Sequence, residues 1–227
     1  MPGSQWTRGL AGLGSRPLTR RELALYAVMI AVGVTAGLVA ASRLHLGMPG
    51  HKALFWMTPI VVARLLCGVR AGATAGSLAA AFTTFAAGGN FAGSFLQPLL
   101  IASAGVVLDA AAALVERSRL AGKPTQVDGN PAVGRSRVAA EGPGPGDRPR
   151  LAWYRALPIM AVGGLAANLL CMVHRLGSPA GAMRGAWGTS GLVALALSYA
   201  AFGLLAGMGG AAAACAIGRL ARRWHQK

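Results

Sequence analysis

The sequence predicts an all-α polytopic membrane protein: a bundle of six transmembrane helices with the N and C termini in the cytoplasm. The composition indicates this first, because 54% of the 227 residues are hydrophobic and only 12% are charged, whereas about a quarter of a soluble domain is charged. The apolar residues also form blocks of about 17 to 27, the length that crosses ~30 Å of hydrocarbon at ~1.5 Å per residue. Finally, the basic residues flank these blocks.

The blocks divide the chain into five expected segments. These are a disordered basic tail (1–22), four transmembrane helices (23–115), a disordered cytoplasmic linker (116–150), two further helices (151–218) and a basic C-terminal tail (219–227). Within them we expect helices at 23–42, 53–69, 71–87, 95–115, 156–173 and over much of 191–217.

Each boundary has a local reason. The first apolar run, 23–42, is too long for the ~7–15-residue core of a signal peptide, so we interpret it as a helix that stays in the membrane. Pro59 should kink the second helix, and neighbouring helices can satisfy the carbonyl that it frees. Residues 116–150 combine prolines, glycines and charges without apolar periodicity, which is typical of a disordered linker.

The distribution of positive charge sets the expected orientation. In the six-helix layout 17 of the 22 Lys and Arg residues fall on the inner side, Arg64 lies inside the bilayer, and the outer side holds Arg43, Lys52, Arg175 and Arg184. An excess of Lys and Arg marks cytoplasmic loops. The chain therefore belongs in the cell membrane, with both termini and the 116–150 linker inside.

Several classes of function are disfavoured. The net charge of +16 could suggest nucleic acid, but the basic residues flank apolar spans without interleaved aromatics, so we expect no nucleic-acid partner. Cys67, Cys171 and Cys215 lie in or beside apolar runs without metal-ligand spacing, so we interpret them as small buried hydrophobes. We expect neither a metal nor a cofactor.

An enzymatic activity is the least favoured class of function for this chain. Ser190, in a Gly-Thr-Ser-Gly context, is similar to the nucleophile motif of intramembrane serine proteases. Such a nucleophile needs a histidine at the same depth on another helix, and no histidine lies in the middle of an expected span. The zinc-protease motif H-E-x-x-H and nucleotide-binding loops are also missing from the sequence.

Arg64 and Asp109 are the charges expected within the membrane. Each lies about two-thirds of the way along an inward-running span, so their depths match. Isolated, either costs ~2.5–3.5 kcal/mol on insertion scales. A structural ion pair between the second and fourth helices is one interpretation; snorkelling to the interface and a proton or ion relay are the alternatives.

Small residues at four-residue spacing suggest a family. Gly68, Gly72 and Gly76 follow each other around the link between the second and third helices. The first helix carries similar pairs: Ala27/Ala31, Gly33/Gly37 and Ala36/Ala40. With six helices in about 200 residues, this pattern resembles the substrate-binding (S) components of energy-coupling-factor transporters, over about residues 20–218. Small-residue spacing is also common in ordinary packing of membrane helices.

The resemblance implies partners. In that family a small-residue face of the first helix docks a transmembrane coupling subunit, which suggests Ala27 and Ala31 here, and ABC ATPases supply the energy. Two features depart from the family: the 116–150 linker is long, and no stretch matches the substrate motifs of its biotin, riboflavin or thiamine members. Substrate identity therefore does not carry over.

Candidate substrate-binding residues gather at the expected outer ends of the helices. A small-molecule site needs apolar walls and a few convergent polar groups, and the candidates are His51, Trp56, Asn90, Gln97, Asn168 and His174. Asn168 and Gln97 stand out because amides within apolar spans need partners. The competing interpretation is that these side chains lie at the membrane–water interface and bind no ligand, since Trp is enriched there and loop histidines are usually solvated.

The sequence thus leads us to expect a membrane-embedded subunit that captures a small nutrient, vitamin-like or a precursor, and is energised by partner ATPases through a coupling subunit. The alternative is a non-transporting six-helix membrane scaffold or assembly subunit.

Overall fold

The computed structural model describes residues 18–42, 50–87, 96–120, 153–176 and 191–225, and in these ranges every element is helical. The six helices are α2 (Arg20–Ala41), α3 (Lys52–Cys67), α4 (Gly72–Ala86), α5 (Leu96–Leu120), α7 (Trp153–Leu176) and α9 (Gly191–His225). The all-α prediction is confirmed for this part of the chain.

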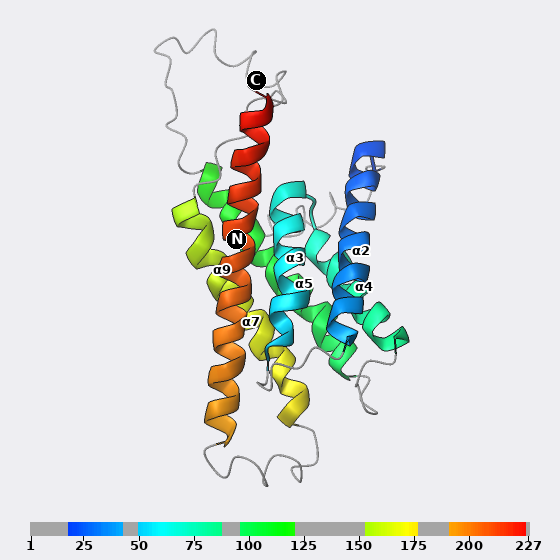
Figure 1. The fold of residues 1–227 in the computed structure, drawn as a ribbon, viewed down its shortest axis with the longest axis vertical. Helices are drawn as coiled ribbons and strands as arrows, with labels where there is room; N and C mark the ends of the chain where they lie inside the picture. The colour runs from blue at the N-terminus through cyan, green and yellow to red at the C-terminus, as the bar shows by residue number, and fades with distance from the viewer. Residues whose placement is uncertain (1–17, 43–49, 88–95, 121–152, 177–190, 226–227) are drawn as a thin grey trace, which may run out of the picture.

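The helices run alternately up and down and form a closed bundle (Figure 1). In space the order of contacting neighbours is α2, α4, α5, α7, α9 and α3, which returns to α2. One end of the bundle holds the start of α2, the link between α3 and α4, the end of α5, the start of α7 and the end of α9. We call it the basic end and call the other the opposite end.

The first helix begins earlier than the apolar pattern indicated, because its start is capped. The Thr19 hydroxyl accepts the Glu22 backbone N–H at 3.2 Å, and the Glu22 carboxylate accepts the Thr19 backbone N–H at 2.9 Å. This reciprocal capping box satisfies two donors that a helix start leaves unpaired. The helix therefore starts at Arg20, inside the expected 1–22 tail.

A four-residue link joins α3 to α4. Gly68 ends α3 in the left-handed region, with φ 66°, and its N–H donates to the Arg64 carbonyl at 3.0 Å. Ala71 adopts φ 54° immediately before α4, a conformation that L-residues rarely adopt. The two left-handed residues reverse the chain within 68–71, so the helices expected at 53–69 and 71–87 end and begin farther apart than predicted.

Three helices extend beyond their expected bounds. α5 continues to Leu120, five residues into the expected linker, since residues 116–120 contain no helix breaker and Glu116 and Ser118 both form contacts there. α7 begins at Trp153. α9 runs to His225 through the expected C-terminal tail, a stretch of Arg, Leu and Ala with good helix propensity.

Glycines allow the helix backbones to approach closely. A Cβ at Gly33 of α2 would overlap the Gly76 carbonyl oxygen of α4, and one at Gly37 would lie 2.6 Å from the Ala80 carbonyl oxygen. On the other side of the bundle, a Cβ at Gly207 of α9 would overlap the Met160 carbonyl of α7. Small residues at helix contacts are typical of bundles in lipid, where close packing drives association.

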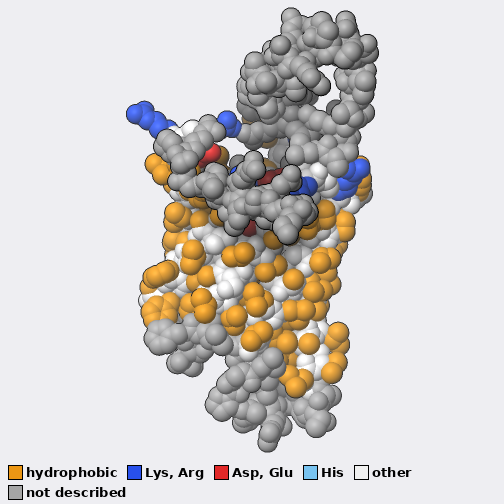
Figure 2. Space-filling model, turned by 180° about the vertical axis from the view of Figure 1, so that it is seen from behind, with side chains coloured by type: hydrophobic (Ala, Val, Ile, Leu, Met, Phe, Trp, Pro, Cys, Tyr) orange, Lys and Arg blue, Asp and Glu red, His pale blue; other side chains and the backbone are white. Residues whose placement is uncertain are grey.

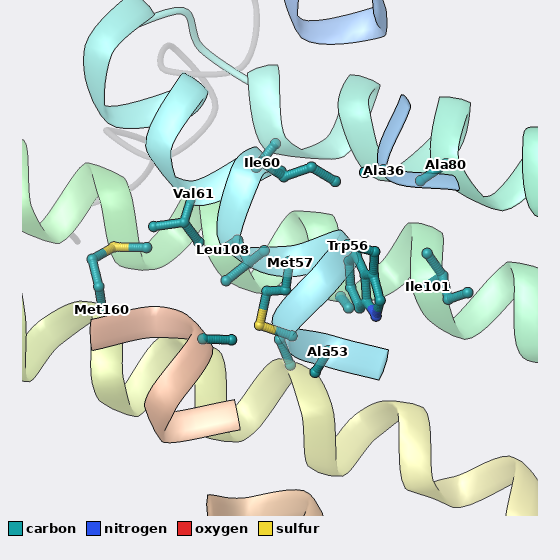
Figure 3. Packing of buried hydrophobic residues seen from close by; sticks show 14 of the residues in the cluster. Ala36, Ala53, Trp56, Met57, Ile60, Val61, Ala80, Ile101, Leu108 and Met160 are labelled. Atoms are coloured by element: carbon teal, nitrogen blue, oxygen red, sulfur yellow. The ribbon is translucent and has the colours of Figure 1, made fainter. Parts of the chain in front are cut away.

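Larger side chains fill the centre, between α3 and α5. Trp56 and Met57 of α3 lie beside Leu108 of α5, with Met160 of α7 near them, whereas Ile60 of α3 faces α4 (Figure 3). All five are buried. α3 is the central helix of the bundle, because it contacts α2, α4, α5 and α9.

Four helices are long and apolar enough to cross a membrane by length and composition: α2, and most of α5, α7 and α9. α3 and α4, with 16 and 15 residues, are shorter than that criterion. Figure 2 shows a broad hydrophobic surface with Lys and Arg gathered at the basic end. These features indicate that the chain belongs to the broad class of helical, multi-pass membrane proteins.

Candidate functional site

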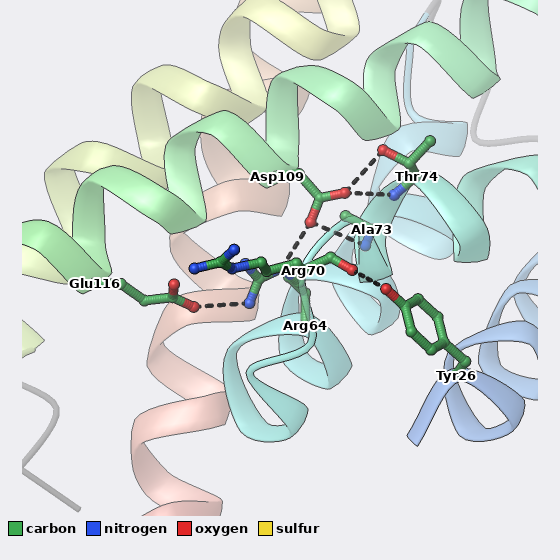
Figure 4. A network of polar contacts seen from close by, with 7 residues as sticks. All are labelled: Tyr26, Arg64, Arg70, Ala73, Thr74, Asp109 and Glu116. Atoms are coloured by element: carbon green, nitrogen blue, oxygen red, sulfur yellow. Dashed lines mark hydrogen bonds and ion pairs between the residues drawn. The ribbon is translucent and has the colours of Figure 1, made fainter. Parts of the chain in front are cut away.

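The basic end holds a buried ionic network. Arg64 of α3 is only 2% exposed, and its Nε donates to Asp109 Oδ1 of α5 at 2.7 Å. Its Nη1 donates to Glu116 Oε1, two turns further along α5, at 2.9 Å. One guanidinium therefore bridges two carboxylates on one face of α5 (Figure 4). The Arg64 side chain stays inside the bundle and does not extend to the interface.

Asp109 also caps the start of α4. Its carboxylate accepts the backbone N–H groups of Ala73 and Thr74 at 3.2 and 2.8 Å, and the Thr74 hydroxyl at 2.8 Å. A helix start carries partial positive charge and unpaired N–H donors, so a carboxylate there is stabilised. Ala71, which precedes α4, forms no side-chain cap of its own. A residue of α5 thus supplies the cap that the sequence of α4 lacks.

Two further contacts tie other helices to this end. The Tyr26 hydroxyl of α2 donates to the Arg70 carbonyl in the α3–α4 link at 2.5 Å. Arg155 Nη1 of α7 donates to the Ser118 carbonyl near the end of α5 at 2.7 Å. Polar contacts therefore join α2, α3, α4, α5 and α7 at the basic end.

The opposite end brings aromatic and polar side chains onto α9. His51, just before α3, is buried, and its ring lies edge-on to Phe55 and to Phe202 of α9, with centroids 6.4 Å apart in both pairs. Its neighbour Gly50, with φ 80°, packs against Tyr199, since a Cβ there would lie 3.0 Å from the Tyr199 Cα. The start of α3 is therefore seated on α9 through these residues.

Asn168, on α7, contacts the same part of α9. This α7 residue is 2% exposed, and its Nδ2 donates to the Tyr199 carbonyl at 2.7 Å. Gly50, which precedes His51, and Asn168 thus both contact Tyr199, although the sequence separates them widely. An imidazole and an amide both donate and accept hydrogen bonds, and the rings nearby offer flat apolar contact. Such a set suits a small polar molecule with a planar part.

Of the four other candidate residues, Trp56 alone has a side chain that the structure describes. Trp56 is buried in the central core, between α3 and α5, which is a packing position. Asn90 lies outside the described residues. Gln97 and His174 lie on α5 and α7, close to the opposite end, but their side chains are outside the described part of the structure.

The two small-residue faces of α2 have different surroundings. Gly33, Gly37, Ala36 and Ala40 are buried, and the two glycines pack against α4. Their spacing therefore serves packing within the bundle. Ala27 and Ala31 are exposed on another face of the helix.

Sequence reasoning missed several residues of these sites. Glu116 was assigned to the linker, yet it follows Asp109 by seven residues, a spacing that places both on one helix face. That spacing could have signalled a shared partner. Thr74, Tyr26 and Tyr199 carried no signal, because their roles depend on where the α3–α4 link and α9 lie in space.

Neither end resembles a metal centre. In the described ranges, no group of three or more His, Cys, Asp or Glu side chains could hold a metal ion. The buried polar atom that stands apart is Ser77 Oγ of α4, which has no hydrogen-bond partner in the structure. Ser77 is packed tightly against Gly105 of α5, since a Cβ on that glycine would lie 2.7 Å from the Ser77 Cβ.

Comparison with known proteins does not assign the chain to a family. No protein-family model matches the chain, and searches of curated proteins and of solved structures give no match.

Proposed function

We propose that this chain is a membrane-embedded capture subunit that binds a small nutrient, vitamin-like or a precursor, and that partner ABC ATPases energise uptake through a coupling subunit. The observation that carries the proposal is that two buried polar side chains lie against the same part of α9, His51 beside Phe202 and Asn168 on the Tyr199 carbonyl. Polar side chains at membrane depth are costly, and those that face a bundle interior typically mark a substrate pathway or ligand site.

The proposed direction of capture rests on charge. We assign the basic end to the cytoplasm, because Arg20, Arg70, Arg117 and Arg219 all lie there while Lys52 lies at the opposite end. This is the asymmetry of the positive-inside rule. The ligand then arrives from outside, at the end where His51 and Asn168 lie. The ionic network closes the other end.

The proposed topology has six spans. α3 and α4 are short for a bilayer, at about 24 and 22 Å, but they pack side by side with the candidate spans α2, α5 and α9 (Figure 1). Short spans are accommodated by local thinning of the bilayer at modest cost. α3 is also enclosed by four other helices, so little of it needs to match the lipid.

We further propose that the coupling subunit docks on α2 at Ala27 and Ala31. Both alanines are exposed and lie one turn apart, Ala27 in the half of α2 nearer the basic end and Ala31 at the middle of the helix. A partner helix could approach the α2 backbone closely there. Gly33 and Gly37 of α2 are occupied by α4.

Bound small molecules provide the test of capture. The full chain is purified from cells, denatured, and the released compounds are identified by mass spectrometry. Asn168→Leu and His51→Leu should each reduce occupancy by about tenfold, the effect of losing one good hydrogen bond. Thr35→Val is the matched control, because this exposed hydroxyl bonds only to the Ala31 carbonyl of its own helix.

Two outcomes would contradict the proposal. Equal occupancy in all three variants would move the ligand site away from Tyr199. Absence of any released compound, together with co-purification of membrane proteins other than ATPases and a coupling subunit, would favour the scaffold alternative. Melting temperatures of the variants separate a lost ligand from a lost fold.

A further inference from the structure

The end of α9 projects beyond its neighbours at the basic end. The helix has 35 residues, so it is about 52 Å long, against ~30 Å of hydrocarbon. Its register is given by two contacts: Gly210 packs on Val61 of α3, and Gly207 on Met160 of α7. Because α3 ends at Cys67 and α7 starts at Trp153, α9 passes both of them by about residue 216.

The projecting turns are amphipathic and basic. Ile217, Leu220 and Trp224 share one stripe at helical spacing, and Trp224 is 82% exposed. The arginines of this segment, Arg219, Arg222 and Arg223, are exposed on the other side. The chain contains no Asp or Glu after Asp147, and no described acidic side chain forms an ion pair with these arginines.

The segment begins within the headgroup layer and extends a few ångströms past it. Residues 219–224 lie about 5 to 12 Å beyond the level where α3 ends, and the polar layer on each side of a bilayer is about 5 to 8 Å thick. The α3–α4 link at that level exposes Arg70. Arginines and a Trp just beyond an apolar span form a basic, amphipathic segment of the kind that recognises anionic lipid.

We propose that the α9 segment 217–224 is a binding site for anionic phospholipid headgroups of the leaflet at the basic end. The arginines contact lipid phosphates through charge-assisted hydrogen bonds, in which guanidinium groups are especially effective. Ile217 and Leu220, which lie nearest the bilayer, contact the upper acyl chains, and Trp224 lies farther out, among the headgroups. The site anchors the end of α9 and fixes its depth, independently of any captured substrate.

Photocrosslinking at one exposed position tests this site locally. The full chain carrying Leu220→benzoylphenylalanine is reconstituted in phosphatidylcholine with a minor share of phosphatidylglycerol. We expect the crosslinked lipid to contain phosphatidylglycerol at about three times its bulk share or more. The matched control is Leu99→benzoylphenylalanine, an equally exposed leucine at the opposite end of the bundle, which should capture lipid at the bulk ratio.

The arginines are tested in the same assay. Arg219→Gln/Arg222→Gln/Arg223→Gln should return the Leu220 crosslinks to the bulk ratio, and raising the salt concentration should do so in the unsubstituted chain, which needs no variant to fold. A bulk ratio at Leu220 in low salt, or enrichment that survives the triple substitution, would overturn the proposal. Capture of an acidic protein at Leu220 in native membranes, in place of lipid, would overturn it as well.

Discussion

Asp109 combines two tasks in one side chain. It neutralises the buried Arg64 and accepts two backbone N–H groups at the start of α4. Its side chain is 14% exposed, whereas that of Glu116, the second partner of the same arginine, is 41% exposed. Solvent screens the Glu116 pair much more strongly, and exposed pairs contribute only ~0–1 kcal/mol. The network therefore depends mainly on the Arg64–Asp109 pair.

We predict that Arg64→Ala and Asp109→Ala each destabilise the protein strongly, because each leaves an uncompensated buried charge. Breaking such a pair costs about 3–5 kcal/mol, or about 10 °C of melting temperature for a chain of this size. Thermal unfolding in detergent measures this. The double variant should lose less than the sum of the two. Glu116→Gln is the control, with a shift of a few degrees at most. Strict additivity would mean that the pair is not coupled.

We predict the reverse effect at Ser77. Its buried hydroxyl lacks a partner, so Ser77→Ala removes an unsatisfied polar group and should leave the melting temperature unchanged or raise it. Thr84→Val is the comparison, because the Thr84 hydroxyl donates to the Ala80 carbonyl and to the Gly37 carbonyl of α2. That variant should lose about 1 kcal/mol. If Ser77→Ala destabilises by as much, Ser77 has a partner such as a buried water.

The residues of the ionic network were predictable from the sequence only in part. A pair between Arg64 and Asp109 follows from the cost of isolated intramembrane charges and from their matched depth. The capping role of Asp109 does not, because it requires the left-handed turn at Ala71 to direct the start of α4 at α5. The convergence of His51 and Asn168 on the same part of α9 was hidden for a similar reason: it depends on the register between α3, α7 and α9.

At the scale of elements, α2 has two faces with different roles. Gly33 and Gly37 contact α4 at backbone distance, while Ala27 and Ala31 are exposed. The sequence showed the same small-residue spacing on both faces, so spacing alone could not separate internal packing from a docking surface. The structure separates them by burial.

We predict that substitutions on the two faces of α2 behave differently. Gly33→Ala should destabilise by about 1–3 kcal/mol, because the added methyl overlaps the Gly76 carbonyl and forces the helices apart. Ala27→Leu/Ala31→Leu should leave thermal stability near that of the unsubstituted chain. Under the proposed function it should also abolish co-purification with the coupling subunit.

The comparison is made on one set of purified samples, by melting temperature and by mass spectrometry of bound partners. Equal destabilisation by Gly33→Ala and by Ala27→Leu/Ala31→Leu would mean that Ala27 and Ala31 pack inside the bundle. Retained assembly in the double leucine variant would place the coupling surface on another helix.

At the scale of the whole molecule, the charges and the contacts divide the bundle into two unlike ends. The basic end is held by ion pairs and hydrogen bonds between helices, and the opposite end gathers buried polar side chains. The number of helices and their approximate positions could be predicted, because hydropathy blocks determine them. The full length of α5 and α9 could not, because the helices continue through polar sequence without a breaker.

The orientation of these two ends in the membrane is the claim on which capture from outside depends, and cysteine accessibility measures it most directly. In a background with Cys67, Cys171 and Cys215 replaced by alanine, Ser42→Cys reports the opposite end and Leu18→Cys the basic end; both positions are exposed. A membrane-impermeant thiol reagent added to intact cells should label Ser42→Cys alone, and Leu18→Cys should react only after the cells are opened. Labelling of Leu18→Cys in intact cells, with Ser42→Cys protected, would contradict the account.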